Sequence, residues 1–371
     1  MTIAHLGPSA LPILYPLGGA IQRRIRELAR EQARRGDRVI LYSAGERPGR
    51  RYYQGAEVRT IACRASQPFR SLEFLTKALA DLRREPIDVL HFHSLVEGGV
   101  VFKAVAAKKV LSYDYFQFRR GKRTPLYWFY RWALGQFACL LPVSEYCREA
   151  SVAYWGIHET RARVLYNGVN LDEFAPDPEA GLERRRALAI GDEPVMLYVG
   201  RVCEQKGTDT LLEAYQLVRA SRPETRLVVA GPAGQFGIAE SNGLVRKIRD
   251  AGGLYLGAVD ELALPSIYNL CDVFVMPTRE YEMFGMAAAE AQACGKPVVC
   301  TSHGGLPEVV SESSGLFFPV GDAPALAAQV CSLLANPRRY FSMARAARQN
   351  SKRFQWPAIV EQLDGIYREA A

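Results

Sequence analysis

The sequence predicts an α/β protein of two domains, each built on a parallel sheet. Short apolar segments alternate with helical segments along all 371 residues, and this alternation is typical of a parallel sheet with helices on both faces. The length exceeds the size at which one hydrophobic core usually stops growing, so the chain is expected to divide. A turn-rich stretch at 167–170, followed by Pro176 and Pro178, is the expected hinge.

The first half contains six apolar segments of strand length with helical segments between them. A helix is expected at 20–35, where Gly36 is a natural C-cap, and another at 71–84, ended by Pro86. The expected strands are 2–6, 38–43, 57–62, 88–93, 109–113 and 138–143.

The second half repeats this plan. Continuously apolar segments such as 195–199 predict strands buried on both faces. Ligands bind beyond the carboxyl ends of the strands in such sheets, so two domains in series predict a central cleft that both sheets face. The expected strands are 195–199, 226–230, 273–276, 297–301 and 316–318, and the expected helices are 210–220, 286–294 and 324–334.

Composition excludes several classes of protein. Apolar residues make up 49% and charged residues 23%, the balance of a folded protein. No apolar run reaches the ~18 residues of a spanning helix, and the N-terminal segment lacks the features of a signal peptide, so a cytoplasmic location is expected. The eight cysteines are scattered without zinc-ligand spacing and are expected to be reduced core residues.

The positive charge lies in the first half of the chain. Residues 1–165 carry 27 Lys and Arg against 14 Asp and Glu, and residues 166–371 carry 20 against 25. A basic domain would suit an anionic acceptor, a membrane surface or nucleic acid. No zinc finger, RNA-recognition signature or basic heptad array is present, so nucleic acid is not expected.

The sharpest basic cluster, which includes Arg119 and Arg120, precedes the aromatic segment 125–132. The cluster predicts either a solvated loop or an anion-binding surface. Aromatic side chains beside arginine suit the inner face of a membrane, whereas packing of a helix at 126–138 in the core is the plainer interpretation.

A loop at 200–207 joins the strand 195–199 to the helix 210–220 and carries Arg201 and Lys206. Two cations beside a helix N-terminus form a good anion site, because free backbone N–H groups and the helix dipole also favour negative charge. The order of residues is not that of a Walker A loop. A surface loop is the alternative interpretation.

Two acids lie at a second helix start, with seven residues between them. Glu282 lies on the loop after the strand 273–276, and Glu290 lies on the helix that begins near Gly285. Carboxylates accept hydrogen bonds from sugar and ribose hydroxyls, and the helix start adds free N–H groups. Two unrelated surface glutamates are the alternative.

His93 ends the strand 88–93, where its side chain would emerge at the sheet edge. His91 shares its face, but no third ligand lies nearby in sequence, so no metal is expected. Gly18 and Gly19 open the helix 20–35 and would permit close approach of backbone to a ligand.

Taken together, these features resemble the GT-B fold glycosyltransferases of family 4, which retain the anomeric configuration of a nucleotide sugar. The likeness covers nearly the whole chain. It implies two Rossmann-like domains, an acceptor domain at 1–166 and a nucleotide-sugar domain at 167–354, with a final helix at 355–371 crossing back onto the first. The motifs that carry it are Gly18-Gly19, 35–39, Val143-Ser144, 166–170, Glu282-x7-Glu290, Gly304-Gly305-Leu306-Pro307-Glu308 and 354–356.

The resemblance implies a role for each matching residue. Arg201 and Lys206 would bind the donor diphosphate and stabilise the leaving group without a metal or other cofactor. Glu282 would bind the donor sugar and Glu290 the ribose, while His93 would lie near the reacting sugar. The remaining expected donor contacts are Gly18, Gly19, Val259, Met283, Phe284, Gly285 and Met286, and the expected acceptor contacts are Asp114, Arg119 and Arg120.

The chain departs from the family pattern at two places. A histidine that many relatives have near Asp114 is absent, and Met283 stands where proline is common. The resemblance implies a UDP or GDP sugar as donor and does not identify the sugar or acceptor. The alternatives are a nucleotide-sugar epimerase or hydrolase, a non-catalytic sugar-nucleotide-binding protein and, on the strength of 231–234 alone, a dehydrogenase.

Overall fold

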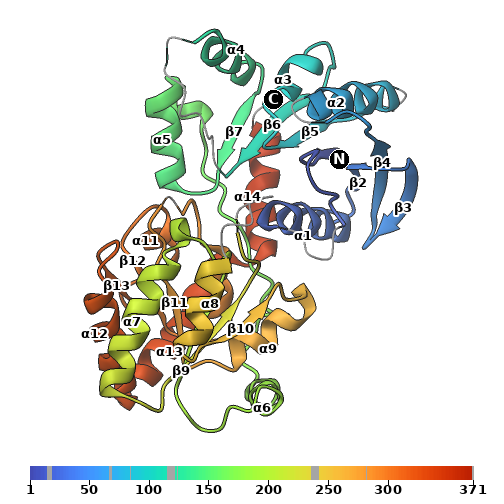
Figure 1. Ribbon diagram of the computed structural model, residues 1–371. Coiled ribbons are helices and arrows are strands. Elements are labelled where there is room, and N and C mark those ends of the chain that lie inside the picture. Colours follow the sequence, from blue (N-terminus) through green and yellow to red (C-terminus); the bar gives the residue numbers. More distant parts are fainter. Residues whose placement is uncertain are drawn as a thin grey trace. The chain divides into compact units, whose positions relative to one another are not determined.

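A computed structural model describes residues 1–14, 19–66, 69–83, 85–114, 122, 124–234, 242–280 and 282–369. The chain divides into two compact units. Unit 1 comprises Met1–Gly168 together with Trp356–Ala371, and unit 2 comprises Val169–Gln355. Each unit contains one sheet with helices packed against it (Figure 1). The two-sheet α/β fold predicted from the sequence is therefore confirmed.

The sheet of unit 1 has seven strands in the order β3-β4-β2-β1-β5-β6-β7, parallel except for β3. Its central strands are almost completely buried, as their apolar sequences require. The strands are β1 (Thr2–Leu6), β2 (Arg38–Gly45), β3 (Gly49–Tyr53), β4 (Ala56–Ala62), β5 (Val89–His93), β6 (Lys108–Tyr113) and β7 (Cys139–Pro142).

Six helices accompany this sheet, and the last comes from the C-terminus. That helix, α14, packs beside α1 (Figure 1), and its Trp356, Ile359 and Leu363 join a core with Ile3 and Val89. The return of the final helix to unit 1 matches the prediction. The helices are α1 (Ala20–Arg34), α2 (Phe69–Leu82), α3 (Gly98–Val101), α4 (Pro125–Leu134), α5 (Glu145–Trp155) and α14 (Trp356–Glu369), with a short 3-10 turn at Glu159–Arg161.

The sheet of unit 2 has six parallel strands in the order β10-β9-β8-β11-β12-β13. Because all six run the same way, the loops that follow them leave from one edge of the sheet. The strands are β8 (Val195–Val199), β9 (Arg226–Ala230), β10 (Leu254–Gly257), β11 (Val273–Met276), β12 (Val298–Thr301) and β13 (Gly315–Phe318).

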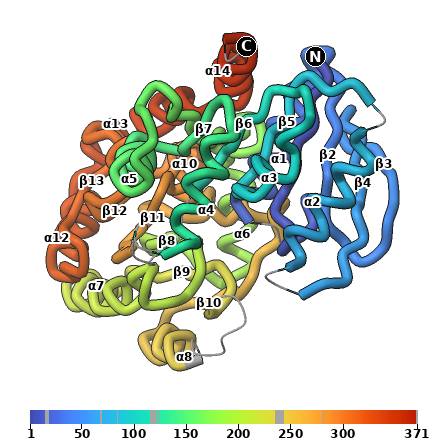
Figure 2. Tube along the Cα trace, turned by 90° about the horizontal axis from the view of Figure 1, so that it is seen from above, coloured from blue at the N-terminus to red at the C-terminus, as the bar shows by residue number. Residues whose placement is uncertain are grey.

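The helices of unit 2 pack against this sheet and against one another. The two helices α7 and α12 pack side by side (Figures 1 and 2), where Leu211, Val218, Leu326 and Val330 belong to one core. The helices are α6 (Pro178–Ala187), α7 (Thr208–Ser221), α8 (Asn242–Asp250), α9 (Leu264–Asn269), α10 (Met286–Ala293), α11 (Leu306–Val309), α12 (Ala323–Leu334) and α13 (Pro337–Ser351), with 3-10 turns at Glu204–Lys206, Glu261–Ala263 and Lys352–Phe354.

The periodicity of the sequence missed two strands. In β3, four of five residues are exposed. An edge strand needs no alternation of apolar and polar residues, and polar side chains protect it from pairing with other chains, so its sequence lacked the pattern of a strand. The other, β10, also lies at a sheet edge and is only partly buried. Seven helices among the described residues were not predicted either: α3, α5, α6, α8, α9, α11 and α13.

Helix α4 ends at Leu134, earlier than the predicted 138. Core packing, the plainer interpretation, holds for one face of the helix, where Tyr127, Ala133 and Leu134 are buried. The other face is exposed: the side chains of Trp128 and Trp132 are 58% and 47% accessible. Among the described residues, no helix is long and apolar enough to cross a membrane.

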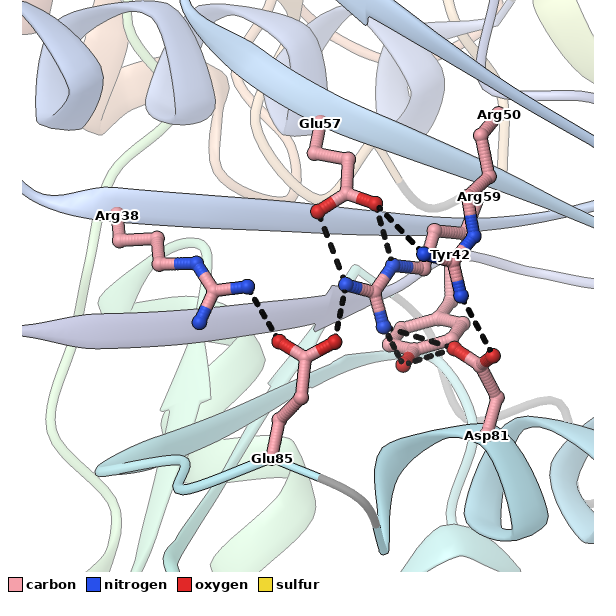
Figure 3. Close-up of polar contacts among 7 residues, drawn as sticks. All are labelled: Arg38, Tyr42, Arg50, Glu57, Arg59, Asp81 and Glu85. Atoms are coloured by element: carbon pink, nitrogen blue, oxygen red, sulfur yellow. Dashed lines mark hydrogen bonds and ion pairs between the residues drawn. The ribbon is translucent and has the colours of Figure 1, made fainter.

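A buried arginine ties β4 to the segment around α2. Arg59 is 3% exposed, and its guanidinium donates to Glu57, Asp81 and Glu85 at 2.8, 2.8 and 2.5 Å (Figure 3). The Tyr42 hydroxyl also donates to Asp81, at 2.9 Å. The hydrogen bond from Arg59 lowers the pKa of Glu57, despite the opposing effect of burial. One guanidinium thus donates hydrogen bonds to three carboxylates.

Candidate active site

The loop after β8 lies against the loop after β11. Gly207, the N-cap of α7, has φ +70, and a Cβ built on it would lie 1.8 Å from the carbonyl oxygen of Pro277. Only glycine permits this close approach of two backbones. As a result, Lys206 reaches the neighbouring loop, and its Nζ lies 2.6 Å from Glu282 Oε2.

Substitution of Gly207 tests this approach. We expect Gly207→Ala to lower the free energy of unfolding by about 2 kcal/mol, because the methyl group meets a carbonyl oxygen and the backbone is left-handed. Urea denaturation measures the change. Gly243→Ala is the matched control in the same unit: a Cβ on Gly243 meets nothing within 4 Å, so its effect should stay within about 1 kcal/mol. Equal midpoints for the two variants would contradict the steric argument.

The position of Glu282 depends on a second glycine pair, after β12. Gly305 N–H donates to the Glu282 carbonyl at 2.7 Å, and a Cβ on Gly304 would lie 2.3 Å from the same oxygen. The predicted Gly304-Gly305 motif therefore supports the backbone of the acidic loop. Gly285 follows with φ +96 as the N-cap of α10.

Arg201 lies on the same loop as Lys206, two residues after the end of β8. Its carbonyl accepts a hydrogen bond from Tyr198 Oη at 2.7 Å. Burial raises the pKa of Tyr198, and among the smaller effects the Glu282 carboxylate raises it while the Arg201 guanidinium lowers it. Both charged side chains thus act on one phenol at the end of β8. Sequence analysis missed this tyrosine, because a tyrosine inside an apolar strand is normally a core residue.

Glu290 is 4% exposed, and its Oε2 accepts a hydrogen bond from Tyr268 Oη at 2.7 Å. The Glu282-x7-Glu290 motif did not predict Tyr268, which lies on α9. Of the other predicted donor contacts, Phe284 is buried and stacks edge-on with Phe354, whereas Val259, Met283 and Met286 are half-buried.

The loops that carry these residues follow adjacent strands. Arg201 and Lys206 follow β8, Val259 follows β10, and Glu282 follows β11, and these strands lie together with β9 at one side of the sheet. Unit 2 therefore collects two cations, one acid and a helix N-terminus along one sheet edge, the arrangement that suits a phosphorylated ligand with hydroxyl groups.

In unit 1 the predicted acceptor contacts Asp114, Arg119 and Arg120 and the predicted donor contacts Gly18 and Gly19 are only partly described. Gly18, Arg119 and Arg120 lie outside the described residues. Asp114 is paired with the buried Arg24, whose Nη1 lies 3.5 Å from its Oδ1. Gly19 is exposed and is the N-cap of α1.

His93 ends β5, as predicted, but it belongs to a group of three histidines. His5 on β1 lies directly opposite His91 in the parallel register, and its Nδ1 is 3.0 Å from His93 Nε2. Each histidine offers a ring nitrogen within 4.8 Å of the others. The sequence suggested only the pair on β5, because a register between separate strands leaves no local pattern.

These three histidines are buried and held in their neutral form. Burial, helped by the nearby Arg24 cation, lowers the pKa of His5 to about 4 and holds those of His91 and His93 well below 6.5. For His5 a hydrogen bond to Gln32 acts in the opposite direction.

The lowered pKa values predict destabilisation by acid. Below pH 6.5 the histidines bind protons in the unfolded state but not in the folded state. The stability that the neutral rings contribute is therefore fully present above that pH and is lost as the pH falls toward 4. Protonation of His5 in the unfolded state should by itself lower the free energy of unfolding by about 2 kcal/mol between pH 7 and pH 5. Protonation of His91 and His93 acts in the same direction. Urea denaturation at the two pH values measures this, and equal midpoints would contradict neutral buried rings.

Comparison with known proteins identifies the family. A family model of Glycosyltransferase Family 4 matches residues 18–173, and one of glycosyl transferases group 1 matches residues 182–353. The chain belongs to glycosyltransferase family 4. The two matches fall almost entirely on separate units, unit 1 with the first model and unit 2 with the second.

Curated relatives of this family 4 chain match over part of their length. A D-inositol 3-phosphate glycosyltransferase of Thermobispora bispora is 36% identical over 223 residues, which are 57% of this chain and 51% of that protein. A GDP-mannose-dependent alpha-(1-6)-phosphatidylinositol monomannoside mannosyltransferase of Mycolicibacterium smegmatis is 33% identical over 217 residues, 56% of this chain and 55% of that protein. The match thus spans about half the length of each relative.

Solved structures confirm the GT-B fold. Sucrose-phosphate synthase from Thermosynechococcus elongatus superimposes with a TM-score of 0.84 at 23% identity, over 100% of this chain and 99% of that one. At this identity the likeness concerns the fold.

Proposed function

We propose that this chain is a glycosyltransferase that moves a sugar from a nucleotide-diphosphate donor to an acceptor hydroxyl. The observation that carries the proposal is the ion pair between Lys206 and Glu282, at the sheet edge where Arg201 and the start of α10 also lie. Membership of family 4 supports the same function.

The ion pair suggests how the donor is received. Before the donor binds, Glu282 holds Lys206 at the loop after β8. A diphosphate has more charge than one carboxylate, so it would draw Lys206 and Arg201 to itself. Glu282 would then accept hydrogen bonds from the sugar hydroxyls, while Glu290 would hold the ribose. Backbone N–H groups at Phe284 and Gly285 would complete the sugar site.

The reaction that we propose retains the anomeric configuration and needs no metal. Negative charge builds on the departing phosphate, and preplaced cations together with the N-terminus of α7 would stabilise it. The acceptor would attack from the same face while the donor phosphate takes its proton. Glu282 therefore binds sugar and does not form a covalent bond. His93 and the residues Gly18 and Gly19 would contact the substrates.

The proposed donor is a UDP or GDP sugar, and the proposed acceptor is anionic or lipid-linked. The M. smegmatis relative is named for GDP-mannose, and the two relatives' names specify an inositol 3-phosphate and a phosphatidylinositol monomannoside. The excess of 27 basic over 14 acidic residues in 1–165 suits an anionic acceptor.

The exposed face of α4 supports peripheral contact with a membrane from the cytoplasmic side. The Arg131 guanidinium lies 5.6 Å from the ring centre of Trp128, and the Lys103 ammonium lies 5.8 Å from that of Trp132. Both exposed tryptophans thus have a cation beside them, a combination that suits anionic lipid. Sedimentation with anionic vesicles at low salt tests this contact. Equal binding by wild type and a Trp128→Ser/Trp132→Ser variant would refute it.

A donor screen followed by an assay tests the function. UDP, GDP, ADP and TDP sugars are compared by thermal shift, because a ligand at 100 times its Kd adds about 2.7 kcal/mol of stability. The donor that binds is then incubated with candidate acceptors in EDTA, and the anomeric proton of the product is followed by NMR.

Each alternative gives a different result in this assay. Donor consumption without an acceptor would indicate an epimerase or hydrolase. Tight binding without turnover would indicate a non-catalytic binding protein. Loss of activity in EDTA would refute metal independence, and inversion at the anomeric carbon would refute retention.

A further inference from the structure

A buried chain of hydrogen bonds connects helix α1 to the end of β5. Gln32 Oε1 lies 2.7 Å from His5 Nε2, and His5 Nδ1 lies 3.0 Å from His93 Nε2. The three side chains are at most 1% exposed. The chain ends at His93 Nδ1, a buried nitrogen without a hydrogen-bond partner among the described residues.

The amide oxygen of Gln32 determines which ring nitrogens of His5 and His93 carry a hydrogen. A carbonyl oxygen only accepts, so His5 Nε2 must carry the proton that it shares with Gln32. A neutral imidazole has one N–H, which leaves His5 Nδ1 as an acceptor and requires His93 Nε2 to donate. His93 Nδ1 then keeps its lone pair.

We propose that Gln32 and His5 are positioning residues that hold His93 as the Nε2–H tautomer, so that His93 Nδ1 accepts a hydrogen bond from a substrate hydroxyl. The inference rests on the proposed function, which supplies hydroxyl-rich substrates. An acceptor nitrogen without a partner is costly in a buried place, and a ligand hydroxyl would satisfy it.

The orientation of the Gln32 amide is decisive for this assignment. If the amide were turned over, its nitrogen would donate to His5, every proton in the chain would reverse, and His93 Nδ1 would become a donor. Gln32 Nε2 makes no hydrogen bond of normal geometry. In the structure it is the amide oxygen that lies 2.7 Å from His5 Nε2. This orientation gives the proton positions described above, and the ring spectrum below tests it directly.

His91 holds the plane of the His93 ring. The two rings stack with centroids 4.2 Å apart and an interplanar angle of 23°. Both nitrogens of His91 have partners, Tyr367 Oη and Ser112 Oγ, each at 2.6 Å. Ser94, the residue after His93, has φ +56, a conformation that non-glycine residues rarely adopt and that is frequent at functional sites.

A metal ion is the competing use of the three histidines. Their nitrogens are close enough for one, but both nitrogens of His5 and of His91 already have partners. A metal would have to displace the bond between His5 and His93. The buried Arg24, whose charge lowers the pKa of all three rings, would also oppose a second cation. The hydrogen-bonded chain is therefore the arrangement that the contacts favour.

The first test is the ring ¹⁵N–¹H NMR spectrum of the wild-type protein at neutral pH, which reports each tautomer without any activity. We expect Nε2–H for His5 and for His93. An Nδ1–H signal for His93 would overturn the proposal. Stoichiometric binding of Zn²⁺ with loss of the Nε2–H signal of His93 would also overturn it, in favour of a metal site.

The second test compares two substitutions of one residue. Gln32→Leu removes the acceptor, so His93 should lose its single tautomer and kcat should fall about tenfold or more, with the KM for the donor little changed. Gln32→Glu offers an oxygen in either orientation and should keep both tautomer and kcat. Gln349→Leu, at an exposed position of α13, controls for the loss of an amide.

The outcomes separate the two proposals. An unchanged kcat in a folded Gln32→Leu protein would refute the positioning role even if the tautomer is as expected. If Gln32→Leu does not fold, Gln32→Glu decides: the carboxylate presents an acceptor to His5 in either orientation, so loss of the Nε2–H tautomer of His93 in this variant would refute control of the tautomer by residue 32. A wild type with the expected tautomer but no sugar transfer would contradict the proposed function and, with it, the role of His93 Nδ1.

Discussion

Lys206→Ala should lower kcat at least about a hundredfold, because it removes a preplaced cation from the departing diphosphate. Lys206 stands directly before the N-terminus of α7, so its charge and the helix dipole would act on the same phosphate. The substitution removes only one of the two cations that follow β8, and the remaining Arg201 should keep some activity. Single-turnover measurement of product formation gives the rate of the chemical step.

The fold should survive this change. The side chains of Lys206 and Glu282 are 21% and 17% exposed, so water still reaches the carboxylate that would be left, and the loss should stay between the cost of an exposed and a buried pair, about 1–2 kcal/mol. Lys247→Ala, an exposed lysine on α8, is the control for loss of a positive charge from unit 2. Turnover of Lys206→Ala within a few-fold of wild type would eliminate its role at the leaving group.

Arg59→Met should destabilise the protein by about 3 kcal/mol, because it removes a buried guanidinium and the ion pairs that it makes. The methionine preserves much of the volume, but the exposed Arg38 and Arg50 would be the remaining partners of the three carboxylates, those of Glu57, Asp81 and Glu85. Their repulsion and the loss of the hydrogen bonds act together. Chemical denaturation followed by circular dichroism measures the loss.

The same network supplies a matched control. Arg50 also pairs with Glu57 and Asp81 (Figure 3), but it is 61% exposed, so Arg50→Met should cost less than about 1 kcal/mol. If Arg59→Met and Arg50→Met lower the free energy of unfolding by similar amounts, burial does not strengthen the ion pairs of Arg59.

Local patterns in the sequence were sufficient for the strands and loops that carry the candidate site. The buried strands β8 and β11 are continuous apolar runs, and the polar loops after them contain Arg201, Lys206 and Glu282. Family likeness then gave each residue an expected role. Edge strands such as β3 were not predicted, because their side chains are exposed and exposed strands show no periodic apolar pattern.

Contacts between distant segments could not be predicted in this way. Nothing near His93 in sequence indicates that His5 would lie beside it, since that depends on the register of β1 against β5. Nor does any local pattern show that Lys206 would meet Glu282, 76 positions later. That contact needs Gly207 against Pro277.

The sequence by itself determined the two α/β units, the order of most of their strands along the chain and the chemistry available at their ends. The tertiary structure decided which of those groups touch: Arg59 with its three carboxylates, Lys206 with Glu282, and Gln32 with His5 and His93. The reason is physical. Periodicity reports the burial of each segment, which is a local property, whereas strand order and register arise from packing between segments far apart in the chain.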